Sequence, residues 1–135
     1  RGTGGRGGGG KERIEGECGG VSAVRRACEG VDFVCHEDAL GSIQRSIDEP
    51  ATTVASNVGG TAKIFAAARD ARVRRVIYAS SSSVYGDSAA LPKREGEEGV
   101  ALSPSAASKV MNEELAAVFG RCYGMALIGM RYFNV

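Results

Sequence analysis

The sequence has almost no net charge, no long apolar run and few cysteines. Its 17 Lys and Arg residues and 16 Asp and Glu residues give a formal charge of +1, which creates no long-range field to attract nucleic acid or an anionic membrane. No apolar run approaches the roughly 20 residues that cross a bilayer. Residues 1–10 lack the apolar core of a signal peptide. We therefore expect a cytoplasmic protein that binds neither nucleic acid nor membrane.

The cysteines have neither disulfide nor metal-site spacing. They are Cys18, Cys28, Cys35 and Cys122, no two of them form a C-x-x-C pair, and three lie in apolar segments. Buried free thiols are the expectation. Residues 35–38 (CHED) contain metal-ligand types, but consecutive side chains at a strand end point to alternate faces and converge poorly on one ion. We expect no metal.

Two regions differ in composition. Residues 1–12 are dominated by glycine and have no periodic pattern, which predicts a disordered tail. In residues 13–135, short apolar runs alternate with amphipathic stretches, as in an ordinary globular domain.

Three short apolar runs predict buried strands, at residues 31–35, 75–80 and 126–133. A helical pattern precedes each of them. Right-handed crossovers then predict an α/β fold with a parallel sheet covered by helices on both faces. Ligands of such sheets bind beyond the carboxyl ends of the strands, which here are residues 36–42, 80–86 and 132–134.

Apolar residues at helical spacing predict the helices. The first contains Val21, Val24 and Cys28 and ends near Gly30. The second covers residues 51–71, and its predicted buried stripe is Val54, Val58, Ala62 and Phe65. The third begins at Ser103 and Pro104 and ends at Gly124, and its predicted stripe is Met111, Leu115, Val118 and Cys122.

Two positions of the second helix are unusual. Asn57 and Thr61 lie on the flank of the apolar stripe. Gly59 and Gly60 cost about 1 kcal/mol each relative to alanine. Such a pair predicts that a neighbouring element packs closely against the helix there.

Residues 80–86 (SSSSVYG) carry the strongest chemical signal. Hydroxyls at the carboxyl end of a buried strand can hold a sugar hydroxyl or a carbonyl oxygen. The alternative is a polar turn in which the serines only bond nearby backbone. These residues alone leave the two interpretations open.

The order of motifs adds information. SSSSVYG is followed by residues 102–109 (LSPSAASK) at a helix start and by residues 131–135 (RYFNV), with His36 and residues 57–61 (NVGGT) earlier in the chain. In this order they resemble the nucleotide-sugar epimerases and dehydratases, in the extended branch of the short-chain dehydrogenase/reductase family. The resemblance covers residues 13–135. Residues 39–43 (ALGSI) are similar to the subgroup that acts on N-acetylated UDP-hexoses.

The resemblance implies a 4-epimerase with a Rossmann-like, doubly wound sheet, NAD as cofactor and a UDP-sugar as substrate. In this family a tyrosine takes a proton from the sugar 4-hydroxyl while NAD takes hydride from C4. A lysine one helical turn later lowers the pKa of the phenol and holds the ribose hydroxyls. A serine completes the proton relay. Family members are commonly homodimers.

The same resemblance assigns residues to the site. The catalytic positions are Ser81, Ser105 and Lys109. The cofactor-binding positions are Glu17, Ala39, Leu40, Ser56, Asn57, Lys109 and Tyr132. The substrate-binding positions are Ser42, Ser82, Ser83 and Asn134.

The sequence departs from the family pattern in several places. Ser105 occupies the position of the catalytic tyrosine, and the loss of a general base typically costs ~10²–10⁴ in rate. Asp38 lies where the family has a small residue beside the cofactor, and its charge would repel dinucleotide phosphates. Gly4, Gly7 and Gly10 match the glycine spacing of a cofactor loop. The family places two helices and two strands between that loop and the position of Glu17, whereas here Gly10 and Ile14 are nearly adjacent, so chance is the preferred explanation.

We therefore expect an incomplete fold without its first βαβ unit and without the C-terminal substrate segments. Such a chain is expected to bind NAD weakly or not at all, and to be inactive. Three alternatives remain: a 4,6-dehydratase relative, a non-catalytic nucleotide-binding remnant, and an arginine-glycine tail that binds RNA. Dehydratases of this family carry an Asp-Glu pair where this chain has Ser82 and Ser83, which favours the epimerase.

Overall fold

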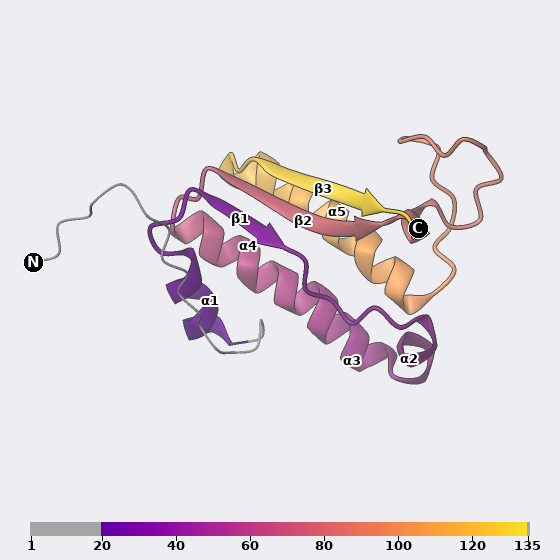
Figure 1. The fold of residues 1–135 in the computed structure, drawn as a ribbon, viewed down its shortest axis with the longest axis horizontal. Coiled ribbons are helices and arrows are strands. Elements are labelled where there is room, and N and C mark those ends of the chain that lie inside the picture. The colour runs from indigo at the N-terminus through magenta and orange to yellow at the C-terminus, as the bar shows by residue number, and fades with distance from the viewer. Residues whose placement is uncertain (1–19, 135) are drawn as a thin grey trace, which may run out of the picture.

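The computed structural model describes residues 20–134 (Figure 1). In chain order the elements are α1 (Val21–Cys28), β1 (Phe33–His36), α2 (Ile43–Asp48), α3 (Pro50–Val54), the π-helical turn η1 (Ala55–Gly59), α4 (Gly60–Asp70), β2 (Arg75–Ser81), the 3₁₀ turn η2 (Ser82–Tyr85), α5 (Pro104–Tyr123) and β3 (Leu127–Tyr132). The α/β class is confirmed. Glu17, Cys18, the three loop glycines and the predicted tail at 1–12 lie outside the described residues.

The sheet is parallel, as predicted. Its order is β1-β2-β3, with Val34 opposite Val76 and Val76 opposite Leu127. Each strand thus pairs with the next strand along the chain. Right-handed crossovers that all run in one direction place every connecting helix on the same face of the sheet.

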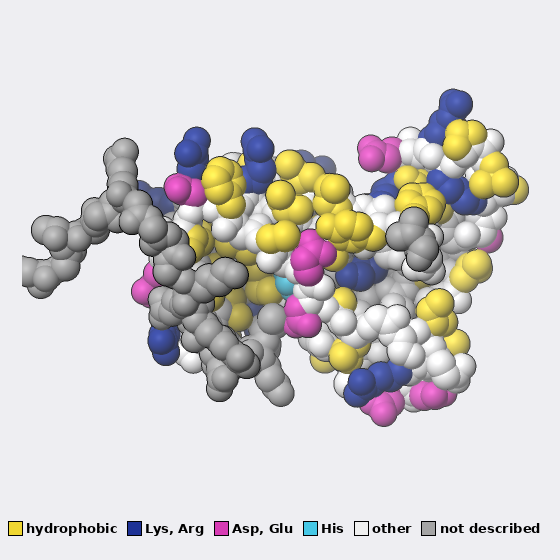
Figure 2. All heavy atoms as spheres, viewed as in Figure 1, with side chains coloured by type: hydrophobic (Ala, Val, Ile, Leu, Met, Phe, Trp, Pro, Cys, Tyr) yellow, Lys and Arg dark blue, Asp and Glu magenta, His cyan; other side chains and the backbone are white. Residues whose placement is uncertain are grey.

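Helices therefore cover one face only within residues 20–134. There α5 contacts β2 and β3, α4 contacts β1, and α1 packs on α4 (Figure 1). The other face is open in this part of the chain, with Phe33 62%, Ile128 41% and Met130 43% exposed. Figure 2 shows hydrophobic side chains gathered over the strands on this side. The prediction of helices on both faces is wrong for the described residues.

The hydrophobic core lies between the covered sheet face and the helices. Phe65 of α4 is fully buried and meets the rings of Tyr78 and Phe119 edge to face, with centroid separations of 5.4 and 5.7 Å. The central strand β2 contributes Val76, which is 1% exposed. By contrast, β1 is a partly exposed strand with a burial pattern that alternates. The prediction of a buried strand at 31–35 is therefore wrong for Phe33 and Cys35, which are exposed.

The second predicted helix is confirmed, with a π-helical turn in its middle. Its buried face is not the predicted stripe, because Val54, Val58 and Ala62 are only half-buried. The buried side chains before Phe65 are instead Thr53, Asn57, Thr61 and Ile64. Asn57 and Thr61 can occupy this face because their polar atoms are hydrogen-bonded inside the protein.

The ends of α5 are confirmed. The hydroxyl of Ser103 accepts a hydrogen bond from the amide of Ala106 at 3.1 Å, Pro104 is the first residue, and Gly124 ends the helix with φ of +65°.

The predicted stripe of α5 is wrong, since Met111 and Val118 are 46% and 41% exposed, Cys122 is exposed, and only Leu115 packs at the core. The buried residues of α5 are Ala106, Ser108, Asn112 and Ala116. Small and amide side chains form this face because it packs against other helices through hydrogen bonds. Cys28 is a buried free thiol as predicted, whereas Cys35 and Cys122 are exposed.

Three described glycines mark close approaches, and none is in the predicted pair. At Gly99 a Cβ would collide with the Asp87 carboxylate. A Cβ at Gly129 would lie 2.6 Å from the Tyr78 hydroxyl, and a Cβ at Gly86 would lie 2.0 Å from the carbonyl oxygen of Val100. Around Gly59 and Gly60 a Cβ would meet no atom within 4 Å. The close packing predicted for that pair is wrong among the described residues.

Two further results concern residues 20–134 only. None of their helices combines the length and apolarity needed to cross a membrane. Their His, Cys, Asp and Glu side chains form no group of three or more that could hold a metal ion.

Replacing Gly129 and Gly59 by alanine compares a crowded glycine with one that has open space around it. Gly129→Ala places a methyl group against the buried Tyr78 ring, so we expect a loss of about 1–3 kcal/mol in the free energy of unfolding. The matched control, Gly59→Ala, has open space and helical dihedrals, so we expect no loss and a gain of up to ~1 kcal/mol. Urea unfolding measures both, and an equal loss in the two variants would contradict the assignment.

Candidate functional site

The carboxyl ends of the three strands meet at one edge of the sheet. They are His36 of β1, Ser81 of β2 and Tyr132 of β3, and Ser81 lies opposite Tyr132 in the register. The segments after these strands and the first turns of α5 carry most of the predicted site residues.

The side chain of Asn57, in η1, joins two of these segments, the loop after β1 and the start of α5. Its Oδ1 accepts a hydrogen bond from the amide of Leu40 at 2.8 Å. Its Nδ2 donates to the carbonyl of Leu40 at 3.2 Å and to the Ser108 hydroxyl at 3.1 Å. Asn57 is 2% exposed, and both of its amide protons are used. It therefore holds the loop after β1 against α5, one residue before Lys109.

Thr61 extends this buried network and sets a histidine tautomer. Its hydroxyl donates to the carbonyl of Asn57 at 2.7 Å, so it accepts from Asn112 Nδ2 at 3.2 Å and from His36 Nε2 at 2.9 Å. A hydroxyl has one proton, so Nε2 of His36 carries a proton. Burial lowers the pKa of His36 below its ordinary value, against the charge of Asp38. The Oδ1 atom of Asn112 is buried and has no hydrogen-bond partner among residues 20–134.

Lys109 reaches from α5 to the end of β2. Its ammonium group donates to the carbonyl of Ala79 at 2.8 Å. Burial lowers the pKa of Lys109, and the carboxylates of Glu37 and Asp38 act in the opposite direction. The ammonium group therefore lies at the end of β2, at the residue two positions before Ser81 and at the edge where the family site is expected. In Figure 2 acidic side chains flank the histidine on this edge.

The serine turn has a defined hydrogen-bond pattern. Ser81 Oγ accepts from the amide of Ser83 at 3.1 Å and from the Ser83 hydroxyl at 3.0 Å. No described residue takes the proton of Ser81 itself. Ser80 points to the other side of the strand and donates to Glu113 Oε1 at 2.5 Å. Local bonding thus accounts for part of the serine run, while Ser81 keeps a hydroxyl proton available for donation.

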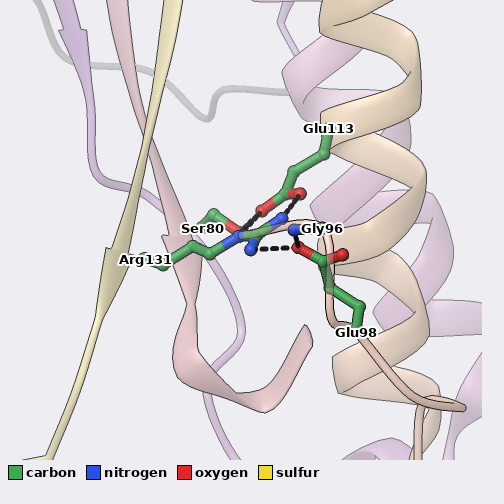
Figure 3. Close-up of polar contacts among 5 residues, drawn as sticks. All are labelled: Ser80, Gly96, Glu98, Glu113 and Arg131. Carbon is green, nitrogen blue, oxygen red and sulfur yellow. Dashed lines mark hydrogen bonds and ion pairs between the residues drawn. The ribbon is translucent and has the colours of Figure 1, made fainter. Parts of the chain in front are cut away.

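An ion cluster lies behind this turn (Figure 3). Arg131 donates to both carboxylate oxygens of Glu113, at 2.9 and 2.7 Å, and its remaining terminal nitrogen contacts Glu98. The guanidinium carbon lies 4.9 Å from the centre of the Tyr85 ring. Burial would raise the pKa of Glu113, but the hydrogen bonds from Arg131 and Ser80 outweigh it and hold that pKa below its ordinary value.

The Glu37 carboxylate contacts two side chains of the sheet at the carboxyl edge. The Tyr132 hydroxyl donates to Glu37 Oε1 at 3.2 Å, and the Cys35 thiol donates to the same oxygen at 3.3 Å. Burial and the bond to Glu37 raise the pKa of Tyr132. Two carboxylates, on Glu37 and Asp38, therefore lie close to the predicted cofactor position.

The other predicted residues have varied surroundings. Ser42 caps α2 by accepting from the amide of Arg45 at 3.2 Å. Ser105 lies half-buried in the first turn of α5, and its carbonyl accepts from Ser108 at 2.7 Å. Ser56 and Asn134 are exposed, and Ala39, Leu40, Ser82 and Ser83 are half-buried.

Glu113 and Glu98 were not predicted from the sequence. Glu113 lies four residues after Lys109 on one helix face. That spacing is the signal that could have identified it. Glu98 has no comparable signal, because its partner, Arg131, is distant in the sequence.

A parallel sheet with hydroxyls, a half-buried lysine and acidic groups at its carboxyl edge is an arrangement of the Rossmann class of α/β proteins, in which ligands bind at that edge. The sequence of residues 5–135 matches the NAD-dependent epimerase/dehydratase family. The chain belongs to this family, whose cofactor is NAD.

The chain is also similar in sequence and structure to individual epimerases and dehydratases. The chain is 31% identical to UDP-glucuronate 4-epimerase 2 of Arabidopsis thaliana over 126 residues, 90% of this chain and 29% of that protein. A UDP-glucose 4-epimerase of Brucella ovis, solved with NAD, superposes with a TM-score of 0.86 at 31% identity and covers 90% of this chain and 38% of that one. A dTDP-glucose 4,6-dehydratase of Streptomyces venezuelae superposes with a TM-score of 0.81 at 31% identity, and the match covers 86% of this chain and 36% of that one. The chain thus spans between 29% and 38% of the length of these proteins.

Truncating Asn57 tests the buried network. Asn57→Ala removes three hydrogen bonds and leaves the polar groups of Leu40 and Ser108 without their partner, so we expect a loss of about 2–4 kcal/mol in unfolding free energy. The same truncation at the exposed Asn134 is the control, with an expected change within ~0.5 kcal/mol. Denaturant unfolding measures both, and similar small losses would show that the network contributes little.

Proposed function

We propose that this chain is part of a nucleotide-sugar 4-epimerase that acts on a UDP-hexose or a UDP-N-acetylhexosamine. The main support is the contact between the Lys109 ammonium and the carbonyl of Ala79. It puts a half-buried cation on the end of β2, at the residue two positions before Ser81, in a chain whose family is NAD-dependent. A solvated surface lysine would not occupy this half-buried position.

The donor set fits the ribose end of a dinucleotide. An ammonium group and a free hydroxyl proton, on Lys109 and Ser81, match the hydroxyls and carbonyl oxygens of such a ligand. When bound, NAD takes hydride from C4 of the sugar and returns it to the opposite face. Lys109 holds ribose hydroxyls, Ser81 hydrogen-bonds the reacting oxygen, and Tyr132 borders the cofactor. The carboxylates of Glu37 and Asp38 weaken binding of the phosphates through charge repulsion.

This chain lacks the general base that would remove the proton from the sugar 4-hydroxyl. Ser105 occupies the position of the family tyrosine, and a serine hydroxyl has neither the reach of a phenol nor its pKa near 10. We therefore expect cofactor binding to be weak at best and turnover of this chain to be very low. Two candidates share this framework, an epimerase part and a nucleotide-sugar binder that has lost its base.

A 4,6-dehydratase is the related alternative, supported by the fit to the Streptomyces venezuelae enzyme. Water elimination requires an acid and a base in the strand-end turn. This chain has Ser82 and Ser83 there, and Ser83 is bonded to Ser81. We prefer the epimerase because hydroxyls of ordinary pKa cannot supply that acid and base pair.

Binding at the carboxyl edge is tested by titrating the chain with UDP-glucose in the presence of NAD. We expect amide chemical-shift changes concentrated at residues 80–86 and near Lys109. Lys109→Met should weaken the response at least about tenfold, since a hydrogen-bonded charge contributes ~1.5–3 kcal/mol. Arg26→Met, on the turn of α1 that precedes β1 at the opposite end of the sheet, is the control. Shifts centred elsewhere would refute the assignment.

Restoring the base tests the reaction. Ser105 and Lys109 lie four residues apart on α5, so a phenol at 105 would lie one turn from the ammonium that lowers its pKa. In a chimera with the flanking segments of a complete relative, Ser105→Tyr should raise 4-epimerase turnover by at least ~10²-fold.

Ser105→Phe is the control for this experiment, because it restores the ring without the hydroxyl and should give no increase. Equal turnover with serine, phenylalanine and tyrosine would mean that another group is the base.

A further inference from the structure

The chain between the serine turn and α5 forms a loop with a closed neck, residues 86–102. The amide of Val100 donates to the Asp87 carboxylate at 2.7 Å, and the amide of Gly99 donates to the carbonyl of Tyr85 at 3.1 Å. Gly86 is required there, because its φ is +53° and a Cβ would collide with the carbonyl of Val100. The neck is therefore attached directly to the last residue of the turn.

One side chain connects this neck to the rest of the site. Arg131 of β3 uses two nitrogens on Glu113 and the third on Glu98, and its guanidinium faces the Tyr85 ring (Figure 3). Glu98 in turn accepts from the amide of Gly96 at 3.1 Å. A planar guanidinium is suited to several partners in fixed directions, whereas a lysine ammonium is not.

The second partner, Glu113, continues the connection to β2. It accepts from the buried hydroxyl of Ser80, which is 3% exposed. Arg131 thus acts on both ends of residues 81–84, through Ser80 at the start and through Tyr85 at the end. None of these contacts belongs to the apolar core, which lies around Phe65 and Val76.

We propose that Arg131 is a positioning residue that fixes the serine turn and the 86–102 loop on α5 as one unit. The positioning itself is independent of the proposed function, and only its benefit for substrate binding rests on that function. Glu113 lies one helical turn after Lys109, so the same ion pair that holds the turn also holds the helix segment carrying the ammonium. The separation between Ser81 and Lys109 is thereby kept constant.

Amide hydrogen exchange of the full chain tests this proposal without activity. The reporters are the amides of Ser83, Gly99 and Val100, whose acceptors are in the turn and neck. In Arg131→Met we expect all three to exchange at least about tenfold faster, because charge-assisted bonds are lost. The core amide of Val76, bonded to Ala126 at 2.9 Å, should be unchanged.

The controls separate local from general effects. Arg69→Met removes an exposed ion pair with Asp70 and should leave all four amides unchanged. Arg131→Lys should restore protection only in part. Glu98→Gln, a mild substitution with little risk to folding, should accelerate Gly99 and Val100 but not Ser83.

Two results would overturn the proposal. Unchanged exchange at the three reporters would show that the turn and neck do not depend on Arg131. Equal acceleration of Val76 and the reporters would show that Arg131 only adds general stability. A wild-type chain that fails to respond to UDP-glucose would instead remove the proposed function, while the exchange result would still decide the role of Arg131.

Discussion

The buried amide of Asn57 is the interaction on which the geometry of the carboxyl edge depends. A buried polar group costs stability unless all its partners are in place, so Leu40 and Ser108 must be positioned together. These residues come from the loop after β1 and from α5, while Thr61 of α4 binds the backbone carbonyl of Asn57. Their agreement fixes where α5 begins relative to the sheet. Lys109, the next residue after Ser108, then reaches the carbonyl of Ala79.

This constraint explains which parts of the fold could be predicted. The strands and their parallel order follow from apolar runs and right-handed crossovers, and the ends of α5 follow from Ser103 and Gly124, because these signals are local. The buried helix faces could not be predicted from apolar periodicity, because Asn57, Thr61 and Asn112 form them in place of Val58 or Met111. A single sequence does not show that distant amides and hydroxyls will satisfy one another.

The candidate site divides in the same way. Its motif residues, such as Ser81 and Lys109, were predicted by resemblance, and their individual roles stay predictions. The ion cluster was not predicted. Arg131 was named only as part of the RYFNV motif, and Glu98 and Glu113 acquire their partners only through the tertiary fold. The uncovered face of the sheet was also missed. Alternating helices and strands predict crossovers, but the direction of each crossover depends on the strand order.

The charges around Lys109 decide whether its ammonium form is favourable when no tyrosine is present at position 105. Burial favours the neutral amine, while the carboxylates of Glu37 and Asp38 favour the ammonium form. In a complete family site a phenolate would share that compensating role, but serine at 105 cannot be ionised at neutral pH. The two carboxylates therefore keep a positive charge on Lys109 favourable without a tyrosine. A carboxylate repels phosphate groups, so the two side chains that favour the ammonium form of Lys109 would act against the phosphates of a dinucleotide bound at this edge.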